Sequence, residues 1–215
     1  MRRVLRWVGW ASAALAVALG TLWVLGPREP VDLTLRFDAA GLPADLDAYL
    51  ASTEAMMGDV TPGAGKRIVW AGTPGAVTDI AVVYVHGFSA TSEEIRPVPD
   101  NVARALKANL FYTRLAGHGL PGERLAGPTV QDWMDDMAEA LAIGQRIGRK
   151  VIVIATSTGG TLAAEAALHP DLKGKIAGIA FVSPNFGLNS RAAMILTWPA
   201  VRRWGPVVAG PERCF

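Results

Sequence analysis

The stretch KVIVIATSTGGTLAAEAALHP, residues 150–170, changes character at its centre. Its first part is an apolar run, Val151 to Ala155, of the kind that forms a strand buried on both faces. Its last part is rich in alanine, the strongest helix former. Thr-Ser-Thr-Gly-Gly lies between them, so the stretch predicts a buried strand, a sharp turn with Ser157 at its apex, and a helix.

Ser157 has two interpretations. Serine is a favoured helix N-cap, worth about 1 kcal/mol. It is also the nucleophile of a strained strand–turn–helix elbow, which requires small residues two positions before and two positions after the serine. Ala155 and Gly159 meet that requirement. A cap alone does not explain glycine at 159 and 160, where alanine would favour a helix, so we favour the elbow, with Ala155, Gly159 and Gly160 in structural roles.

Nucleotide-binding turns do not fit the same stretch. A dinucleotide fingerprint reads GxGxxG, and here Ala155, Ser157 and Gly160 occupy its three glycine positions. A phosphate-binding loop of the form GxxxxGK[ST] is also absent from the sequence.

Apolar runs and helical patterns alternate along the rest of the chain. Strands are expected in residues 66–72, 81–88, 109–117, 150–155 and 175–187, and helices in residues 45–55, 99–108, 130–148 and 158–169. This alternation predicts an α/β fold with a doubly wound, mostly parallel sheet and helices on both faces. In such sheets the binding residues gather at the carboxyl ends of the strands.

Two further loops lie at strand ends, His86-Gly87-Phe88 and Gly117-His118-Gly119. The order HGFSA, RLAGHG, a helix carrying Asp-Trp, and then strand–ATSTG–helix resembles the α/β-hydrolase superfamily, more narrowly the bacterial lysophospholipase and monoacylglycerol lipase group. The resemblance runs from about residue 67 to about residue 187. It implies that Ser157 is the nucleophile and that the backbone N–H groups of Phe88 and Thr158 form the oxyanion hole. His86 and Gly87 then shape the loop.

The same resemblance leaves the acid and the histidine of a catalytic triad unassigned. In this superfamily both follow the serine, and the one histidine after Ser157 is His169, about 18 Å along the helix at 1.5 Å per residue. We interpret His86, His118 and His169 as structural. Asp132, Asp135 and Asp136 are expected to be surface charges that compensate the helix dipole. We expect the C-terminal part of the fold to be missing, with residues 191–215 forming the start of a truncated cap, and this chain to be inactive or weakly active.

The N-terminus carries a membrane signal. Arg2, Arg3 and Arg6 precede an uncharged segment of 20 residues, Trp7 to Gly26. Such a segment spans about 30 Å as a helix, the hydrocarbon thickness of a bilayer. We favour an uncleaved signal anchor in residues 1–26 over a cleaved signal peptide, with the later residues on the extracytoplasmic, periplasmic side. A lead-in segment, residues 27–65, and a hydrolase core, residues 66–190, are expected to follow.

The amino-acid composition excludes several classes of protein. Hydrophobic residues make up 51% of the chain and the formal net charge is +2, so neither disorder nor nucleic-acid binding is expected. The single cysteine, Cys214, excludes an internal disulfide. We expect no metal and no cofactor. The expected function is a serine hydrolase acting on small or lipid carboxylic esters at a membrane, and the alternative is a catalytically dead hydrolase fold that serves as a binding scaffold.

Overall fold

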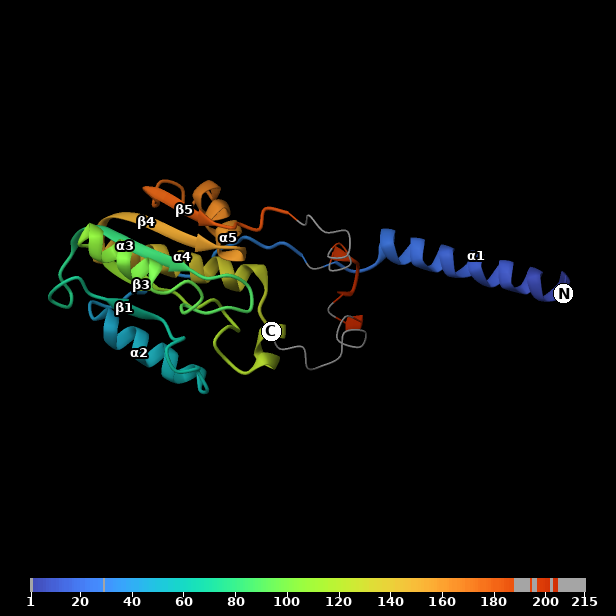
Figure 1. The fold of residues 1–215 in the computed structure, drawn as a ribbon, viewed down its shortest axis with the longest axis horizontal. Coiled ribbons are helices and arrows are strands. Elements are labelled where there is room, and N and C mark those ends of the chain that lie inside the picture. The colour runs from blue at the N-terminus through green and yellow to red at the C-terminus, as the bar shows by residue number, and fades with distance from the viewer. Residues whose placement is uncertain (1, 29, 188–193, 195–196, 202, 205–215) are drawn as a thin grey trace. The chain divides into compact units, whose positions relative to one another are not determined.

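The computed structural model describes residues 2–28, 30–187, 194, 197–201 and 203–204 of the chain. These divide into two compact units, one of residues Val31–Phe186 and one of residues Met1–Pro30 with Gly187–Phe215. Figure 1 labels the elements along the ribbon. The expected cap segment, residues 191–215, lies for the most part outside the described residues.

The secondary structure follows the predicted alternation of strands and helices. The helices are α1 (Arg2–Leu25), α2 (Leu46–Met57), α3 (Val98–Leu106), α4 (Val130–Ile147) and α5 (Thr158–Leu168), with short 3-10 turns at Ala39–Gly41 and Gly122–Ala126. The strands are β1 (Arg67–Val69), β2 (Thr78–Val85), β3 (Asn109–Tyr112), β4 (Gly148–Thr156) and β5 (Gly178–Val182).

The five strands form one sheet in the order β1-β3-β2-β4-β5. β2 pairs in parallel with β3 and with β4, β4 pairs in parallel with β5, and β1 pairs antiparallel with β3. The prediction of an α/β fold with a mostly parallel sheet is confirmed. The carboxyl ends of the two central strands, β2 and β4, lie side by side through the pairing of Val85 with Ala155, and this places the turns that follow them next to each other.

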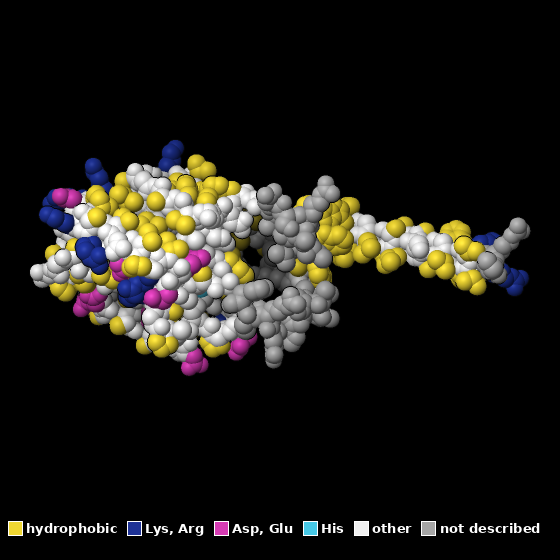
Figure 2. Space-filling model, viewed as in Figure 1, with side chains coloured by type: hydrophobic (Ala, Val, Ile, Leu, Met, Phe, Trp, Pro, Cys, Tyr) yellow, Lys and Arg dark blue, Asp and Glu magenta, His cyan; other side chains and the backbone are white. Residues whose placement is uncertain are grey.

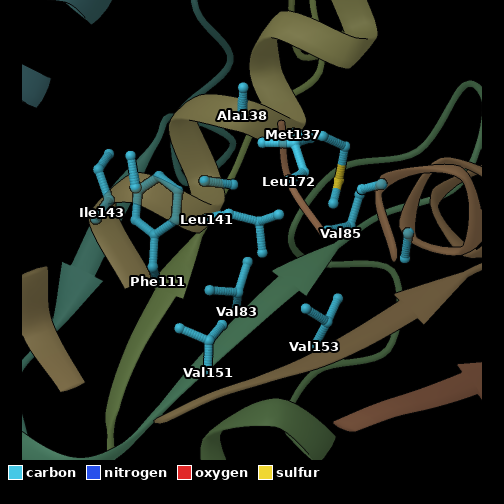
Figure 3. Packing of buried hydrophobic residues seen from close by; sticks show 14 of the residues in the cluster. Val83, Val85, Phe111, Met137, Ala138, Leu141, Ile143, Val151, Val153 and Leu172 are labelled. Carbon is cyan, nitrogen blue, oxygen red and sulfur yellow. The ribbon is translucent and has the colours of Figure 1, made fainter. Parts of the chain in front are cut away.

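Both faces of the sheet are covered. Alternate residues of β2 and β4, such as Val83 and Val153, pack against α4 and α5 in the larger core, which Figure 3 shows with Met137 and Leu141 above the strands. The intervening residues, which include Tyr84, pack on the opposite face with α3. This division follows from the side-chain alternation of a strand, in which neighbouring residues point to opposite faces.

The predicted third strand, residues 109–117, is too long. Pairing ends at Tyr112, and the chain then leaves the sheet. The N–H of Leu115 donates to Nε2 of His86 instead of to a strand, and Gly117 has φ +79°, which is incompatible with extended backbone. Residues 113–119, called the 113–119 loop below, therefore cross the carboxyl end of the sheet instead of extending it.

Residues 31–65 pack on the core. Asp45 caps α2, with its side chain accepting a hydrogen bond from the N–H of Ala48. Leu42, Leu46 and Leu50 are buried in the larger core. The segment before β1 is thus an integral part of the Val31–Phe186 unit.

Candidate active site

Ser157 lies at the corner between β4 and α5 in a backbone conformation that is rare outside glycine, with φ +48° and ψ −115°. Its N–H donates to the carbonyl of Val182 at 3.0 Å, and its carbonyl accepts the N–H of Asn185 at 3.0 Å. Such a conformation costs about 1–3 kcal/mol and persists where the surroundings over-determine it. Here the end of β5 and the residues after it hold both backbone polar groups of the serine.

The Ser157 side chain does not cap the helix. It makes no capping hydrogen bond, whereas Asp45 at α2 and Thr129 at α4 both accept one from their helices. Among the residues that the structure describes, the Ser157 hydroxyl makes no hydrogen bond at all. Ser157 as a residue is half-buried.

The small residues around Ser157 allow close backbone contacts. A Cβ on Gly159 would lie 2.5 Å from the carbonyl oxygen of Val85 and 2.6 Å from that of His86. A Cβ on Gly160 would lie 2.9 Å from Cβ of Pro184. Ala155 is fully buried. The start of α5 therefore packs directly on the end of β2 and on the segment after β5, and this contact requires glycine at both positions.

The loop after β2 reaches the serine from the other side. A Cβ on Gly87 would lie 3.1 Å from Cβ of Ser157, so the backbone of Gly87 is in contact with the serine side chain. The next N–H, that of Phe88, and the first N–H of α5, that of Thr158, donate no hydrogen bond to any described residue. Unpaired donors next to a helix N-terminus favour negative charge.

Both ring nitrogens of His86 bond to the backbone of neighbouring loops. Its Nε2 accepts the N–H of Leu115 at 3.1 Å, so Nδ1 carries the proton and donates to the carbonyl of Gly87 at 2.8 Å. Burial lowers the pKa of His86 to about 3. The ring is therefore neutral at physiological pH, and both of its nitrogens are engaged.

His118 packs against three other rings in tilted or edge-on arrangements. Its centroid lies 4.9 Å from that of His86, 5.8 Å from that of Phe88 and 5.8 Å from that of Trp133. Its Nδ1 bonds to the carbonyl of Ala116 at 3.1 Å. Burial lowers the pKa of His118 as well, against the opposing effect of that bond. His118 is thus a neutral packing partner of Phe88 and Trp133.

His169 lies at the far end of α5. Its Nε2 donates to the carbonyl of Leu33 at 3.0 Å, and its Nδ1 accepts the N–H of Asp171 at 3.2 Å. All 11 residues of α5, about 16 Å of helix, separate it from Ser157. The three histidines of the sequence all lie in the described part of the chain, and none of them bonds to the serine.

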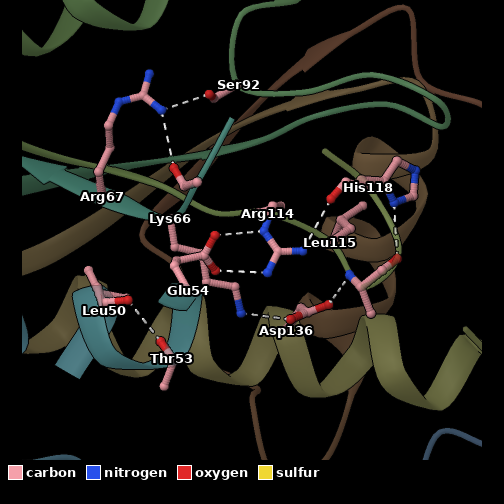
Figure 4. Close-up of polar contacts among 12 residues, drawn as sticks. Leu50, Thr53, Glu54, Lys66, Arg67, Ser92, Arg114, Leu115, His118 and Asp136 are labelled. Atoms are coloured by element: carbon pink, nitrogen blue, oxygen red, sulfur yellow. Dashed lines mark hydrogen bonds and ion pairs between the residues drawn. The ribbon is translucent and has the colours of Figure 1, made fainter. Parts of the chain in front are cut away.

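A buried ionic scaffold supports the 113–119 loop, and the sequence did not predict it. Arg114 pairs with Glu54 through two contacts of 2.8 Å and donates to the carbonyl of His118 at 3.1 Å. Asp136 accepts the N–H of Ala116 and pairs with Lys66 at 2.9 Å. Figure 4 shows both pairs facing the loop. No local pattern marks such pairs, because their members come from distant segments.

Asp136 was expected to be a surface charge, and that prediction is wrong. Its side chain is 12% exposed, because Lys66 folds over it from the segment before β1. Burial opposes the charge of Lys66, but the carboxylates of Asp136 and Glu139 outweigh this effect and raise the lysine pKa. Asp132 and Asp135 instead bind the exposed Arg36, and Asp132 also completes the capping box of α4 with Thr129.

Within the described ranges, no group of three or more His, Cys, Asp or Glu side chains is arranged to hold a metal ion. The described residues contain one helix long and apolar enough to cross a membrane, Arg3–Leu25, and none of it is buried inside the protein. Figure 2 shows hydrophobic side chains along this helix and cationic ones at its N-terminal end. A signal sequence has the same properties.

Comparison with known proteins supports the resemblance noted in the sequence. A model of the alpha/beta hydrolase family matches residues 82–213. A thermostable monoacylglycerol lipase from Bacillus sp. (strain H-257) is 32% identical over 96 residues, which are 44% of this chain and 38% of the lipase. A solved structure of the metagenome-derived lipolytic enzymes LipS and LipT is 26% identical with a TM-score of 0.53, over 63% of this chain and 52% of that one. The chain thus spans about half or less of the length of these relatives.

Proposed function

This chain belongs to the alpha/beta hydrolase family, and we propose that it is a serine hydrolase that cleaves carboxylic esters through an acyl-enzyme on Ser157. One observation carries the proposal. The Ser157 hydroxyl makes no hydrogen bond within the described residues, and the serine sits in a strained corner against the backbone of Gly87. A helix cap would have bonded its own helix. Strain that serves no cap is typical of a functional site.

The proposed reaction has two steps. The Ser157 oxygen attacks the ester carbonyl, its proton passes to the leaving alcohol, and an acyl-serine ester forms. Water then attacks that ester, the carboxylic acid leaves, and the serine hydroxyl is restored. In each step the carbonyl oxygen becomes negatively charged. The N–H groups of Phe88 and Thr158 are the donors we propose for that charge.

Proton transfer requires a general base, and we assign this role to none of the three histidines. His86, His118 and His169 are engaged in the contacts described above. The 215-residue chain by itself is therefore expected to turn over esters weakly or not at all. Its turnover of a short-chain p-nitrophenyl ester, compared with that of a complete family member, measures this directly. Equal turnover would contradict the reasoning.

Lipid or small esters are the substrates we propose. The Bacillus relative is a monoacylglycerol lipase, and LipS and LipT are lipolytic enzymes. The exposed ring of Phe88 and the neighbouring Trp133 offer apolar surface, and Phe88 directly follows Gly87, which approaches Ser157. We further propose that α1 is a signal anchor that keeps the hydrolase unit at the extracytoplasmic surface of a membrane, where such substrates are found.

Active-site labelling tests the proposal. An active-site-directed fluorophosphonate, applied to membranes of the organism that makes this protein, is expected to modify Ser157, with the site identified by peptide mass spectrometry. Ser157→Ala should abolish the modification. Ser183→Ala is the matched control, because Ser183 also follows a strand and has φ +45°, and it should label like the unmodified protein. Absence of label at Ser157 would count against an acyl-enzyme.

The contacts of the three histidines support a second proposal. None of the three histidines bonds to Ser157, so a catalytically inactive hydrolase fold that serves as a binding scaffold at the membrane is the alternative proposal. The two proposals predict different results for one variant, Ser157→Ala. A Ser157→Ala strain that keeps the cellular phenotype of the unmodified protein would support the scaffold, and loss of the phenotype would support the enzyme.

A further inference from the structure

Glu94 lies in the loop between β2 and α3, and its carboxylate turns back toward the carboxyl end of the sheet. Its Oε2 accepts the N–H of Gly87 at 2.9 Å and the hydroxyl of Tyr84 at 3.0 Å. Its own N–H donates to the carbonyl of Thr91 at 3.1 Å, which fixes the turn that carries it. No motif in the sequence pointed to this residue. The carboxylate nevertheless bonds directly to the loop that we propose as half of the oxyanion hole.

Tyr84 extends this contact to the other half of the site. The phenol is fully buried, and burial first of all raises its pKa, so the ring keeps its proton. The Tyr84 hydroxyl donates its proton to the Glu94 carboxylate. The tyrosine oxygen can then accept from the hydroxyl of Thr156, which lies 3.1 Å away. Thr156 directly precedes Ser157, so Glu94 is linked through Tyr84 to the corner that holds the serine.

Gly87 lies between the Glu94 carboxylate and Ser157. A Cβ on this glycine would lie 3.0 Å from Oε1 of Glu94 and 3.1 Å from Cβ of Ser157. Its two polar groups are held from opposite directions, since Glu94 takes the N–H and Nδ1 of His86 donates to the carbonyl. That carbonyl shares a trans peptide unit with the N–H of Phe88. In a trans peptide the C=O and N–H point in opposite directions, so the orientation of the Gly87 carbonyl sets the direction of the Phe88 N–H. His86 and the N–H of Ala90 bond to that carbonyl, and Glu94 fixes the preceding peptide unit through the Gly87 N–H, so Gly87 is held on both sides.

We propose that Glu94 is a positioning residue for the oxyanion hole, with its carboxylate holding Gly87 so that the N–H of Phe88 points at the reacting oxygen. The inference rests on the proposed function, because the oxyanion hole belongs to that proposal. Glu94 acts through the backbone and contacts no substrate atom in this role. The function of the carboxylate is hydrogen-bond acceptance, which an amide oxygen can reproduce.

Three variants test the proposal in the full chain. Glu94→Ala removes the acceptor, and Glu94→Gln keeps an acceptor oxygen of the same reach. Glu93→Ala is the matched control, because the neighbouring Glu93 pairs with Arg67 and Arg96 and not with Gly87. The first measurement is hydrogen exchange of the peptide that covers residues 86–90. We expect faster exchange in Glu94→Ala, and exchange like that of the unmodified protein in Glu94→Gln and Glu93→Ala.

The second measurement is the rate at which a fluorophosphonate modifies Ser157, followed with the same variants in their native membranes. Loss of one oxyanion donor lowers rates by about 100-fold or more, and a displaced donor should cost at least about 10-fold. Glu94→Ala is expected to lose that factor in the maximal rate with little change in the concentration for half-maximal rate. Glu94→Gln should recover most of it. A denaturant midpoint for each variant separates this effect from unfolding.

Hydrogen exchange and labelling rate test different parts of the proposal. Exchange in Glu94→Ala that matches the Glu93→Ala control would overturn the positioning role, whatever the activity. Faster exchange together with an unchanged labelling rate would also overturn it, because the loop would then be held without aiming a donor. Faster exchange in a protein whose Ser157 never reacts would overturn the proposed function, and with it the catalytic part of the inference, while supporting the structural contact.

Discussion

Ser157 shows at the scale of one residue how backbone strain can be maintained. Its φ of +48° is costly for any residue other than glycine, because the Cβ meets the backbone. The cost is offset by hydrogen bonds to Val182 and Asn185 and by the absence of side chains at Gly159 and Gly160. The serine is therefore held by its neighbours and not by its own side chain. Substitutions of those neighbours should reveal this arrangement.

Gly159→Ala should destabilise the fold and displace the corner. The added methyl would lie 2.5 Å from the Val85 carbonyl oxygen, a backbone atom that cannot swing away. Overpacking of this kind costs about 1–3 kcal/mol, and the denaturant midpoint measures it. Gly178→Ala is the control, because a Cβ there meets nothing within 4 Å. Equal midpoints for the two variants would contradict the close approach described here.

His86 should make the stability of the hydrolase unit dependent on pH. Burial lowers its folded-state pKa from 6.5 to about 3, so below pH 6.5 the unfolded chain binds a proton that the folded chain refuses. Stability is then complete above pH 6.5 and is lost as the pH falls toward 3, by about 1.4 kcal/mol per pH unit. Urea unfolding between pH 5 and 6.5 measures the slope. His118 acts in the same direction.

The variant His86→Asn measures how much of this pH dependence of stability comes from His86. His86→Asn removes the titrating ring, so its stability should vary less with pH over the same window, although its absolute stability should be lower because the bond to Leu115 is lost. An unchanged slope in His86→Asn would assign the pH dependence to other groups.

At the scale of elements, the 113–119 loop is held in place by side chains of the helices α2 and α4. Glu54 of α2 pairs with Arg114, and Asp136 of α4 accepts the N–H of Ala116. The loop in turn bonds to His86 through the N–H of Leu115. The segment before β1 therefore helps to fix the surroundings of Ser157, although it contributes no residue that touches the serine among the described contacts.

Glu54→Gln should destabilise the fold more than a surface charge deletion does. The side chain of Arg114 is 4% exposed, and loss of its partner leaves a buried cation without its carboxylate. Breaking such a pair costs about 3 kcal/mol. Asp79→Asn is the control, because Asp79 pairs with Arg149 at 84% side-chain exposure and should matter little. Chemical denaturation compares the two, and similar losses would show that the buried pair is weakly coupled to folding.

At the scale of the whole molecule, α1 is the element that we propose as the membrane anchor of the unit Val31–Phe186. Its 23 apolar-rich residues, Arg3–Leu25, extend about 35 Å as a helix, enough to cross the hydrocarbon layer. The described chain divides into one unit that contains α1 and one that contains the sheet with Ser157. Membrane attachment and catalysis are therefore proposed to belong to different units of the same chain.

Extraction and intact mass test the proposed anchor. The full chain should stay with membranes in alkaline carbonate and keep the mass of its N-terminal residues, whereas a chain lacking residues 1–26 should be released. The physical reason is that a spanning helix leaves the bilayer only at the cost of exposing its apolar surface. A mature protein without those residues would instead identify a cleaved signal peptide.

The sequence alone determined what is encoded locally. Strand and helix types follow from apolar periodicity, and the α/β class with a mostly parallel sheet follows from their alternation. The turn at 157 is visible in the small residues around it. Side-chain alternation along β2 and β4 also separates the two cores, because the period of a strand is fixed.

Only the tertiary structure decided which polar side chains and loops contact one another. Glu94 bonds to Gly87, Lys66 folds over Asp136, and the 113–119 loop leaves the sheet to bond to His86. None of these contacts can be predicted from a local sequence pattern, because the two partners do not share the repeat of one helix or one strand. Their cause is burial, because a polar group removed from water must find a partner, and the fold alone brings that partner within reach.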